Sequence, residues 1–190
     1  MIFIPEIPNN KSTKYIEKFI ENCKTLAVKD YDDDDNSFIF NQAATIEDIN
    51  EWEKNNNIHI PSSYKDWLLF SNGSILCDSS LKFYSLNDIV IDNDQKPYNV
   101  PDEYIIIGSF IDIEEWYGFS RETGQIVIFG EYEETEVEGF EEILEILTKV
   151  MWLAFCSEIV KYSMAILNWP INDIAKHMLS INFFWYDYVI

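Results

Sequence analysis

The side chains with the most chemical potential in this 190-residue chain are its carboxylates. Asp and Glu number 34 against 13 Lys and Arg, so the formal net charge at pH 7 is −21. Three clusters hold many of them: Asp32–Asp35; Asp112, Glu114 and Glu115; and Glu131, Glu133, Glu134, Glu136 and Glu138. Carboxylates can bind a cation, work in pairs as general acid and base, or attract a basic partner.

The run Asp32–Asp35 is the strongest candidate for a Ca²⁺ site. A calcium-binding loop of the common kind needs Asp-x-Asp-x-Asp-Gly with a Glu at its twelfth position, and this sequence lacks that pattern. Four consecutive like charges are more typical of a solvated loop. We therefore expect no required metal and no cofactor.

Nucleophilic and acid–base catalysis find little support. Neither of the two histidines, His59 and His177, lies in a catalytic motif, and no phosphate-binding glycine loop or Gly-x-Ser-x-Gly occurs. Two carboxylates held a fixed distance apart could still hydrolyse a glycosidic bond, and a sequence does not show that spacing. The prediction is a non-enzymatic protein without catalytic residues, with a carboxylate-based hydrolase as a distant alternative.

The charge also bears on partners and compartment. A field of this sign repels phosphate backbones and anionic lipids, so we expect neither nucleic acid nor membrane as a partner. No apolar run approaches the roughly 20 residues of a membrane span, and residues 1–6 lack the features of a signal peptide. Cys23, Cys77 and Cys156 are odd in number and far apart, which predicts a cytoplasmic protein without disulfides. Solubility alone remains a second explanation for the acidity.

The first half of the chain predicts helices. Apolar residues recur at helical spacing over residues 12–26, with Ser12 as a candidate N-cap. Thr45 and Asp48 fit a capping box, and Pro61 suits the first turn of a further helix that Asn72-Gly73 would close. Trp52, Trp67 and Trp152 lie on apolar helix stripes and are expected in the core, whereas Trp116, Trp169 and Trp185 could be interface anchors.

The second half changes to the period of a sheet. Residues 81–86, 104–111, 116–120 and 125–129 are rich in aromatic and β-branched residues, and Gly124 marks a hairpin turn. Residues 131–138 predict an exposed acidic loop, and a helix starts near Gly139. The fold class is α+β, an antiparallel central sheet flanked by helices, with a helical, aromatic-rich C-terminal extension. We expect one domain over residues 1–190, made of a core (45–155), an N-terminal helix and acidic loop (1–44) and the extension (156–190).

The order of motifs resembles the SUKH superfamily, which takes in fungal cell-wall-synthesis regulators and bacterial toxin-immunity proteins. The resemblance rests on the capped helix from Thr45, on Ile60-Pro61-Ser62-Ser63-Tyr64, on Asn72-Gly73, and on the closing Gly139-Phe140-Glu141-Glu142-Ile143-Leu144. The Gly-Asp that often follows the family's Ile-Gly strand is replaced here by Asp112-Ile113-Glu114-Glu115.

The resemblance implies an immunity protein that neutralises a cognate polymorphic toxin, and the charge suggests a nuclease-type toxin with a basic surface. The alternative is a regulatory protein-interaction module of the same fold without a toxin partner. The residues predicted to bind the partner are Asp112, Glu114, Glu115, Glu131, Glu133, Glu134 and Glu136.

Overall fold

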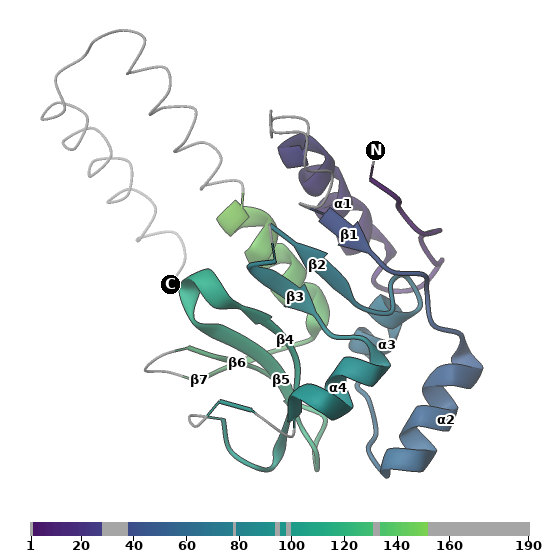
Figure 1. Cartoon of the computed structure of the whole chain (residues 1–190), viewed down its shortest axis with the longest axis vertical. Helices are drawn as coiled ribbons and strands as arrows, with labels where there is room; N and C mark the ends of the chain where they lie inside the picture. The colour runs from purple at the N-terminus through teal and green to yellow at the C-terminus, as the bar shows by residue number, and fades with distance from the viewer. Residues whose placement is uncertain are drawn as a thin grey trace, which may run out of the picture. The chain divides into compact units, whose positions relative to one another are not determined.

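An antiparallel sheet of seven strands organises the computed structural model (Figure 1). The structure describes residues 2–27, 38–77, 79–93, 96–97, 100–130 and 134–151. By its internal contacts the chain divides into two units, Met1–Thr148 and Lys149–Ile190. Of the second unit only residues 149–151 are described, and they are helical. The predicted C-terminal extension (156–190), Trp152, Trp169, Trp185, His177 and the Asp32–Asp35 run all lie outside the described residues.

The strands follow one another in space as they do in sequence. They are β1 (Phe38–Phe40), β2 (Ser74–Leu76), β3 (Leu81–Phe83), β4 (Tyr104–Phe110), β5 (Glu115–Ser120), β6 (Ile126–Phe129) and β7 (Glu134–Val137). Every neighbouring pair is antiparallel, so the sheet is a meander with β1 and β7 at its edges. The predicted α+β class with an antiparallel sheet is confirmed.

The helices are α1 (Thr13–Ala27), α2 (Ile46–Asn56), α3 (Ser62–Leu68), α4 (Leu86–Asn93), the short 3₁₀ helix η1 (Ile111–Ile113) and a helix over residues 140–151. The predicted capping box of α2 is present, because the Thr45 side chain accepts from the Asp48 N–H and the Asp48 side chain accepts from the Thr45 N–H. Asn57 ends α2 in the left-handed conformation.

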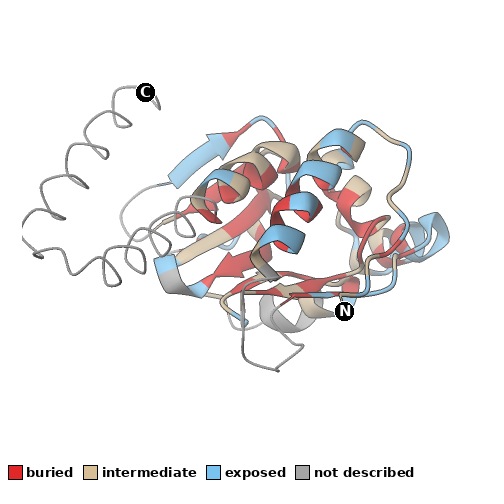
Figure 2. Ribbon diagram, turned by 90° about the horizontal axis from the view of Figure 1, so that it is seen from above, coloured by how far each residue is buried: buried red, intermediate tan, exposed pale blue. Residues whose placement is uncertain are grey.

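A cluster of aromatic rings joins the helices to one face of the sheet. Trp67 of α3 lies at its centre and contacts Phe19 of α1, Phe83 of β3 and Phe140 of the last helix, with ring centroids 5.9, 4.8 and 5.6 Å away. All four side chains are almost wholly buried. Figure 2 shows buried positions, in red, on both the strands and the helices. The predicted core positions of Trp67 and Trp52 are confirmed, and Trp52 also donates its indole N–H to the Leu86 carbonyl at 2.6 Å.

Three local predictions are wrong. Helix α3 ends at Leu68, and Gly73, at φ +90°, leads into β2 instead of closing the helix. The strand predicted over residues 81–86 ends at Phe83, and Leu86 begins α4, where Ser85 and Asp88 make a second capping box. The acidic stretch predicted as a loop contains the edge strand β7. A Ser-x-x-Asp pattern at Ser85 was the signal for α4 in the sequence.

Candidate partner-binding surface

Strand β7 carries two of the predicted partner-binding residues on one face of the sheet. Glu134 lies opposite Phe129 and Glu136 opposite Val127, so both carboxylates share the face that Phe129 and Val127 occupy on β6. Both side chains are exposed, and the backbone beneath them is held by pairing with β6. Glu131 and Glu133, which were predicted to belong to the same cluster, lie outside the described residues.

Tyr104 of β4 reaches the same face, although β5 and β6 lie between it and β7. Its hydroxyl donates to Glu134 Oε1 at 3.0 Å, and its ring packs edge-on against Phe129 with centroids 5.0 Å apart. The hydrogen bond to Glu134 raises the pKa of the Tyr104 phenol, and the carboxylates of Glu103 and Glu136 add to the rise. We call Tyr104, Glu103, Glu134 and Glu136 the Tyr104 patch.

Gly118 makes room for this arrangement. It shares the face of Tyr104 and Phe129, and a Cβ there would lie 2.9 Å from the Ile105 carbonyl and 3.3 Å from the Phe129 ring. The missing side chain lets the Tyr104 and Phe129 rings meet across β5. Tyr104, Glu103 and Gly118 were not among the predicted site residues, because nothing local in the sequence shows that β4 and β7 meet on one face.

The second predicted acidic cluster forms the turn between β4 and β5. The backbone of Asp112 lies in η1, and Glu114 follows in the left-handed conformation at φ 53° with an exposed side chain. Glu115 opens β5, where its carboxylate accepts a hydrogen bond from the Tyr117 hydroxyl at 3.3 Å. Ile111 and Ile113 flank Asp112 and are 59% and 42% exposed. The turn therefore exposes both apolar side chains and the charge of Glu114.

The turn and the start of β7 lie at the same end of the sheet. Trp116 of β5 pairs with Phe129 of β6, and Phe129 pairs with Glu134 of β7. Glu115 directly precedes Trp116, so its backbone lies one residue along the strand from the level of Glu134, with β6 between the two strands. Neighbouring strands are about 4.8 Å apart, which puts these two backbone positions about 10 Å from each other. The structure thus brings part of the two predicted clusters to one end of the sheet, with Glu115 and Glu134 on its opposite faces, while Glu136 lies further along β7.

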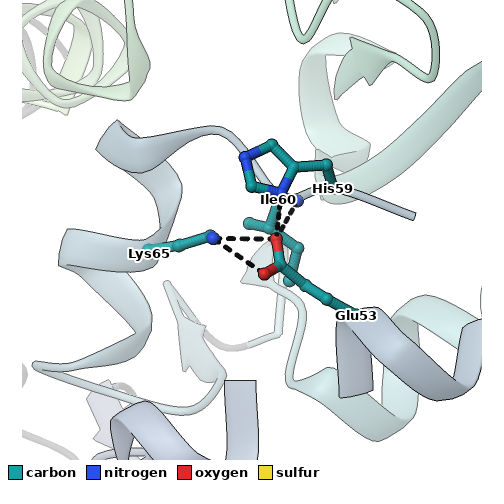
Figure 3. Close-up of polar contacts among 4 residues, drawn as sticks. All are labelled: Glu53, His59, Ile60 and Lys65. Carbon is teal, nitrogen blue, oxygen red and sulfur yellow. Dashed lines mark hydrogen bonds and ion pairs between the residues drawn. The ribbon is translucent and has the colours of Figure 1, made fainter. Parts of the chain in front are cut away.

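A third polar group, around Glu53, is structural in character (Figure 3). Glu53 of α2 accepts from the Ile60 N–H at 2.6 Å, forms an ion pair with Lys65 of α3 at 2.8 Å and lies 3.0 Å from the Nδ1 of His59. The Glu53 side chain is only 14% exposed, whereas His59 is 84% exposed. This carboxylate fixes the connection between α2 and α3, while His59 lies at the surface.

Tyr64 fixes the same connection to the sheet. Its hydroxyl lies 2.5 Å from the Tyr84 carbonyl and 3.1 Å from the Ile107 carbonyl, beside the irregularity in the β4–β5 register between Ile106 and Gly108. Gly108 is needed at this point, because a Cβ would lie 2.6 Å from the Lys82 carbonyl. Pro61 and Tyr64 therefore work together, one starting α3 and the other anchoring it.

Within the described ranges, no group of three or more His, Cys, Asp or Glu side chains could hold a metal ion. Across the same residues, no helix combines the length and apolarity that crossing a membrane requires.

Comparison with known proteins agrees with this architecture. No curated protein matches the chain. The profile of the SMI1 / KNR4 family (SUKH-1) matches residues 43–149, which is more than half of the sequence and runs from α2 through β7, leaving out α1 and β1. The family is generally an immunity or binding module rather than an enzyme. The match, together with the antiparallel sheet and its helices, shows that the chain belongs to the SMI1 / KNR4 family (SUKH-1).

Proposed function

We propose that this protein is an immunity protein that binds a cognate polymorphic toxin of the nuclease type and neutralises it through its acidic surface. The family includes toxin-immunity proteins, which supports the class. The net charge of −21 supports a basic partner, because nucleases that bind a phosphate backbone carry basic clefts that an acidic surface can fill.

The observation that carries the proposal is the placement of Glu134 and Glu136 on a strand. Their backbone is ordered by pairing with β6, and Glu134 is further fixed by the Tyr104 hydroxyl. Carboxylates that are already positioned lose less conformational entropy on binding than those of a loose loop. A solubilising surface has no need of such positioning.

The β4–β5 turn extends the proposed surface. Glu114 supplies a charge, and the exposed Ile111 and Ile113 supply apolar area of the kind found at the centre of protein interfaces. Asp112, Glu115, Glu131 and Glu133 belong to the proposal as the remaining residues predicted to bind the partner.

The test needs a cognate toxin, which is sought first as a toxin-like domain encoded by a neighbouring gene. Its association rate is measured by stopped flow as a function of ionic strength, with the wild type and with Glu134→Gln/Glu136→Gln. The matched control is Glu17→Gln/Glu51→Gln, which removes the same two charges from exposed positions of α1 and α2. Rim charges chiefly alter the association rate, whereas close buried pairs alter dissociation by larger factors.

We expect the β7 variant to associate about tenfold more slowly at low salt, with a flatter salt dependence, and the control to behave as wild type. Protection of cells that express the toxin should weaken in parallel. Equal effects of the two variants would mean that net charge alone is responsible. If neither variant changes the rate, recognition does not use the acidic edge, and the regulatory module without a toxin becomes the better hypothesis.

A further inference from the structure

Ser12 lies between two carboxylates that come from distant parts of the chain. It directly precedes α1 and is only 2% exposed. Its hydroxyl oxygen is 3.0 Å from Asp66 Oδ2 on α3 and 2.8 Å from Glu141 Oε1 in the first turn of the last helix. The predicted capping role of Ser12 is therefore only partly realised, because its hydroxyl contacts these side chains.

The two contacts cannot both be hydrogen bonds if both acids are ionised. A serine hydroxyl carries one proton, and an ionised carboxylate can only accept. Ser12 can therefore donate to one carboxylate, and the other must approach it as a protonated acid that donates to the Ser12 oxygen. Without that second proton, a carboxylate oxygen would face a hydroxyl lone pair at hydrogen-bond distance, next to a second negative charge.

We propose that Asp66 and Glu141 share one proton through Ser12, and that this acid–hydroxyl–carboxylate chain is a pH-sensitive latch between α1 and the two helices it packs on. Helix α1 precedes residues 43–149, which the family profile matches, so the latch joins a segment outside the matched range to two helices within it.

The electrostatic surroundings favour Asp66 as the proton carrier. Burial raises the pKa of the Asp66 carboxyl and the charge of Glu141 adds to this, while the Ser12 hydrogen bond and the Lys11 ammonium lower it. Three of the other charged side chains on the adjoining helices have partners elsewhere. Lys65 pairs with Glu53, Glu142 accepts from the Glu138 N–H, and Lys14 lies over the Tyr15 ring.

A raised pKa in the folded state fixes the sign of the pH effect. The native cluster binds a proton more tightly than the unfolded chain does, so its contribution to stability is fully present below the ordinary Asp value of 3.8. That contribution is lost as the pH rises through the raised pKa. The latch is closed in acid and loosens toward neutral pH, opposite to the usual effect of a salt-bridged carboxylate.

Asp66→Asn tests the latch, because an amide donates permanently where the acid donates only when protonated. We expect Asp66→Asn to match the wild-type melting temperature near pH 4 and to exceed it by about 2–4 °C near pH 7.5. Glu51→Gln, which removes one exposed charge from α2, controls for the general relief of negative charge. Ser12→Ala, which removes the bridging oxygen, should lower the melting temperature more near pH 4, where the latch is closed, than near pH 7.5.

Three results would overturn the proposal. One is a melting temperature of Asp66→Asn below wild type by the same amount at every pH. Another is a titration of the Asp66 carboxyl at or below 3.8, followed by ¹³C NMR with the signal assigned by its loss in Asp66→Asn. The third is stabilisation of the wild type but not of Asp66→Asn by millimolar Ca²⁺ at pH 7.5, which would mean that a cation and not a proton bridges the two acids.

Discussion

The hydroxyl of Tyr104 on β4 bonds the carboxylate of Glu134 on β7, so the sheet is linked across two intervening strands by one side-chain contact. This contact orients a carboxylate at the edge of the sheet from a residue well inside it. Because the pKa of the Tyr104 phenol depends on Glu134, the contact can be followed by titrating the tyrosine.

We predict that the Tyr104 phenol titrates above the ordinary value of 10, and that Glu134→Gln brings its pKa down toward that value. The proton is retained because the phenol donates to a carboxylate, and two further carboxylates oppose a phenolate. The contribution of this bond to stability is present below pH 10 and is lost as the pH rises through the raised pKa.

The measurement is the ¹³Cζ shift of Tyr104 against pH, assigned among the 11 tyrosines by its loss in Tyr104→Phe. Thr135→Ala, on the same strand but the opposite face, is the control and should leave the titration unchanged. Identical titration curves for the wild type and Glu134→Gln would show that the contact is not maintained in solution.

Gly118→Ala should destabilise the protein by about 1–3 kcal/mol, the usual cost of forcing a methyl group into a packed site. The Ile105 carbonyl, 2.9 Å from the added Cβ, is backbone and cannot turn aside as a side chain could. Gly124→Ala is the matched control, because its Cβ would meet nothing closer than 3.9 Å and only its φ of +73° opposes the change. The free energies of unfolding of both variants are measured in urea. A smaller loss for Gly118→Ala than for Gly124→Ala would contradict the prediction.

Local patterns in the sequence predicted much of the fold. The capping box at Thr45, the Pro61 start of α3 and the Gly124 hairpin depend on residues within a few positions of one another, and each is present. Strand β7 was missed because charged residues on an edge strand have the composition of a loop. Their side chains stay in water while only the backbone pairs.

The candidate site was predictable only in part, for a different reason. Glu134, Glu136 and Glu114 are conspicuous by composition, and the structure gives them exposed positions. Tyr104 and Gly118 acquire their roles from the order of strands, which brings residues from β4, β5 and β7 onto one face. The Ser12 contacts likewise join residues 54 and 129 positions apart, and no local pattern reports such distances.

Trp67→Ala should cost about 3–5 kcal/mol of unfolding free energy, as for other large buried aromatics. Trp67 is 0% exposed and contacts rings from α1, β1, β3 and the last helix, so its loss leaves a cavity bounded by several elements. Its indole N–H makes no hydrogen bond among the described residues. Trp67→Phe, which removes that buried donor, should therefore cost much less. A denaturation midpoint unchanged in Trp67→Ala would place the ring outside the core.

The last prediction compares the loss of the largely buried Glu53 carboxylate with the loss of the exposed His59 ring beside it. Glu53→Ala removes the acceptor of the Ile60 N–H and the partner of Lys65, which is 23% exposed. We expect a loss of about 2–3 kcal/mol, since hydrogen bonds to charged groups are among the stronger ones and both donors lose their partner. Glu53→Gln should recover part of this, because its amide oxygen can still accept from Ile60.

His59→Ala should change the unfolding free energy by less than about 0.5 kcal/mol, since solvent already surrounds the ring. The three variants are compared by urea unfolding at pH 7. If His59→Ala proved as costly as Glu53→Ala, the imidazole and not the Lys65 ammonium would be the main partner of the carboxylate.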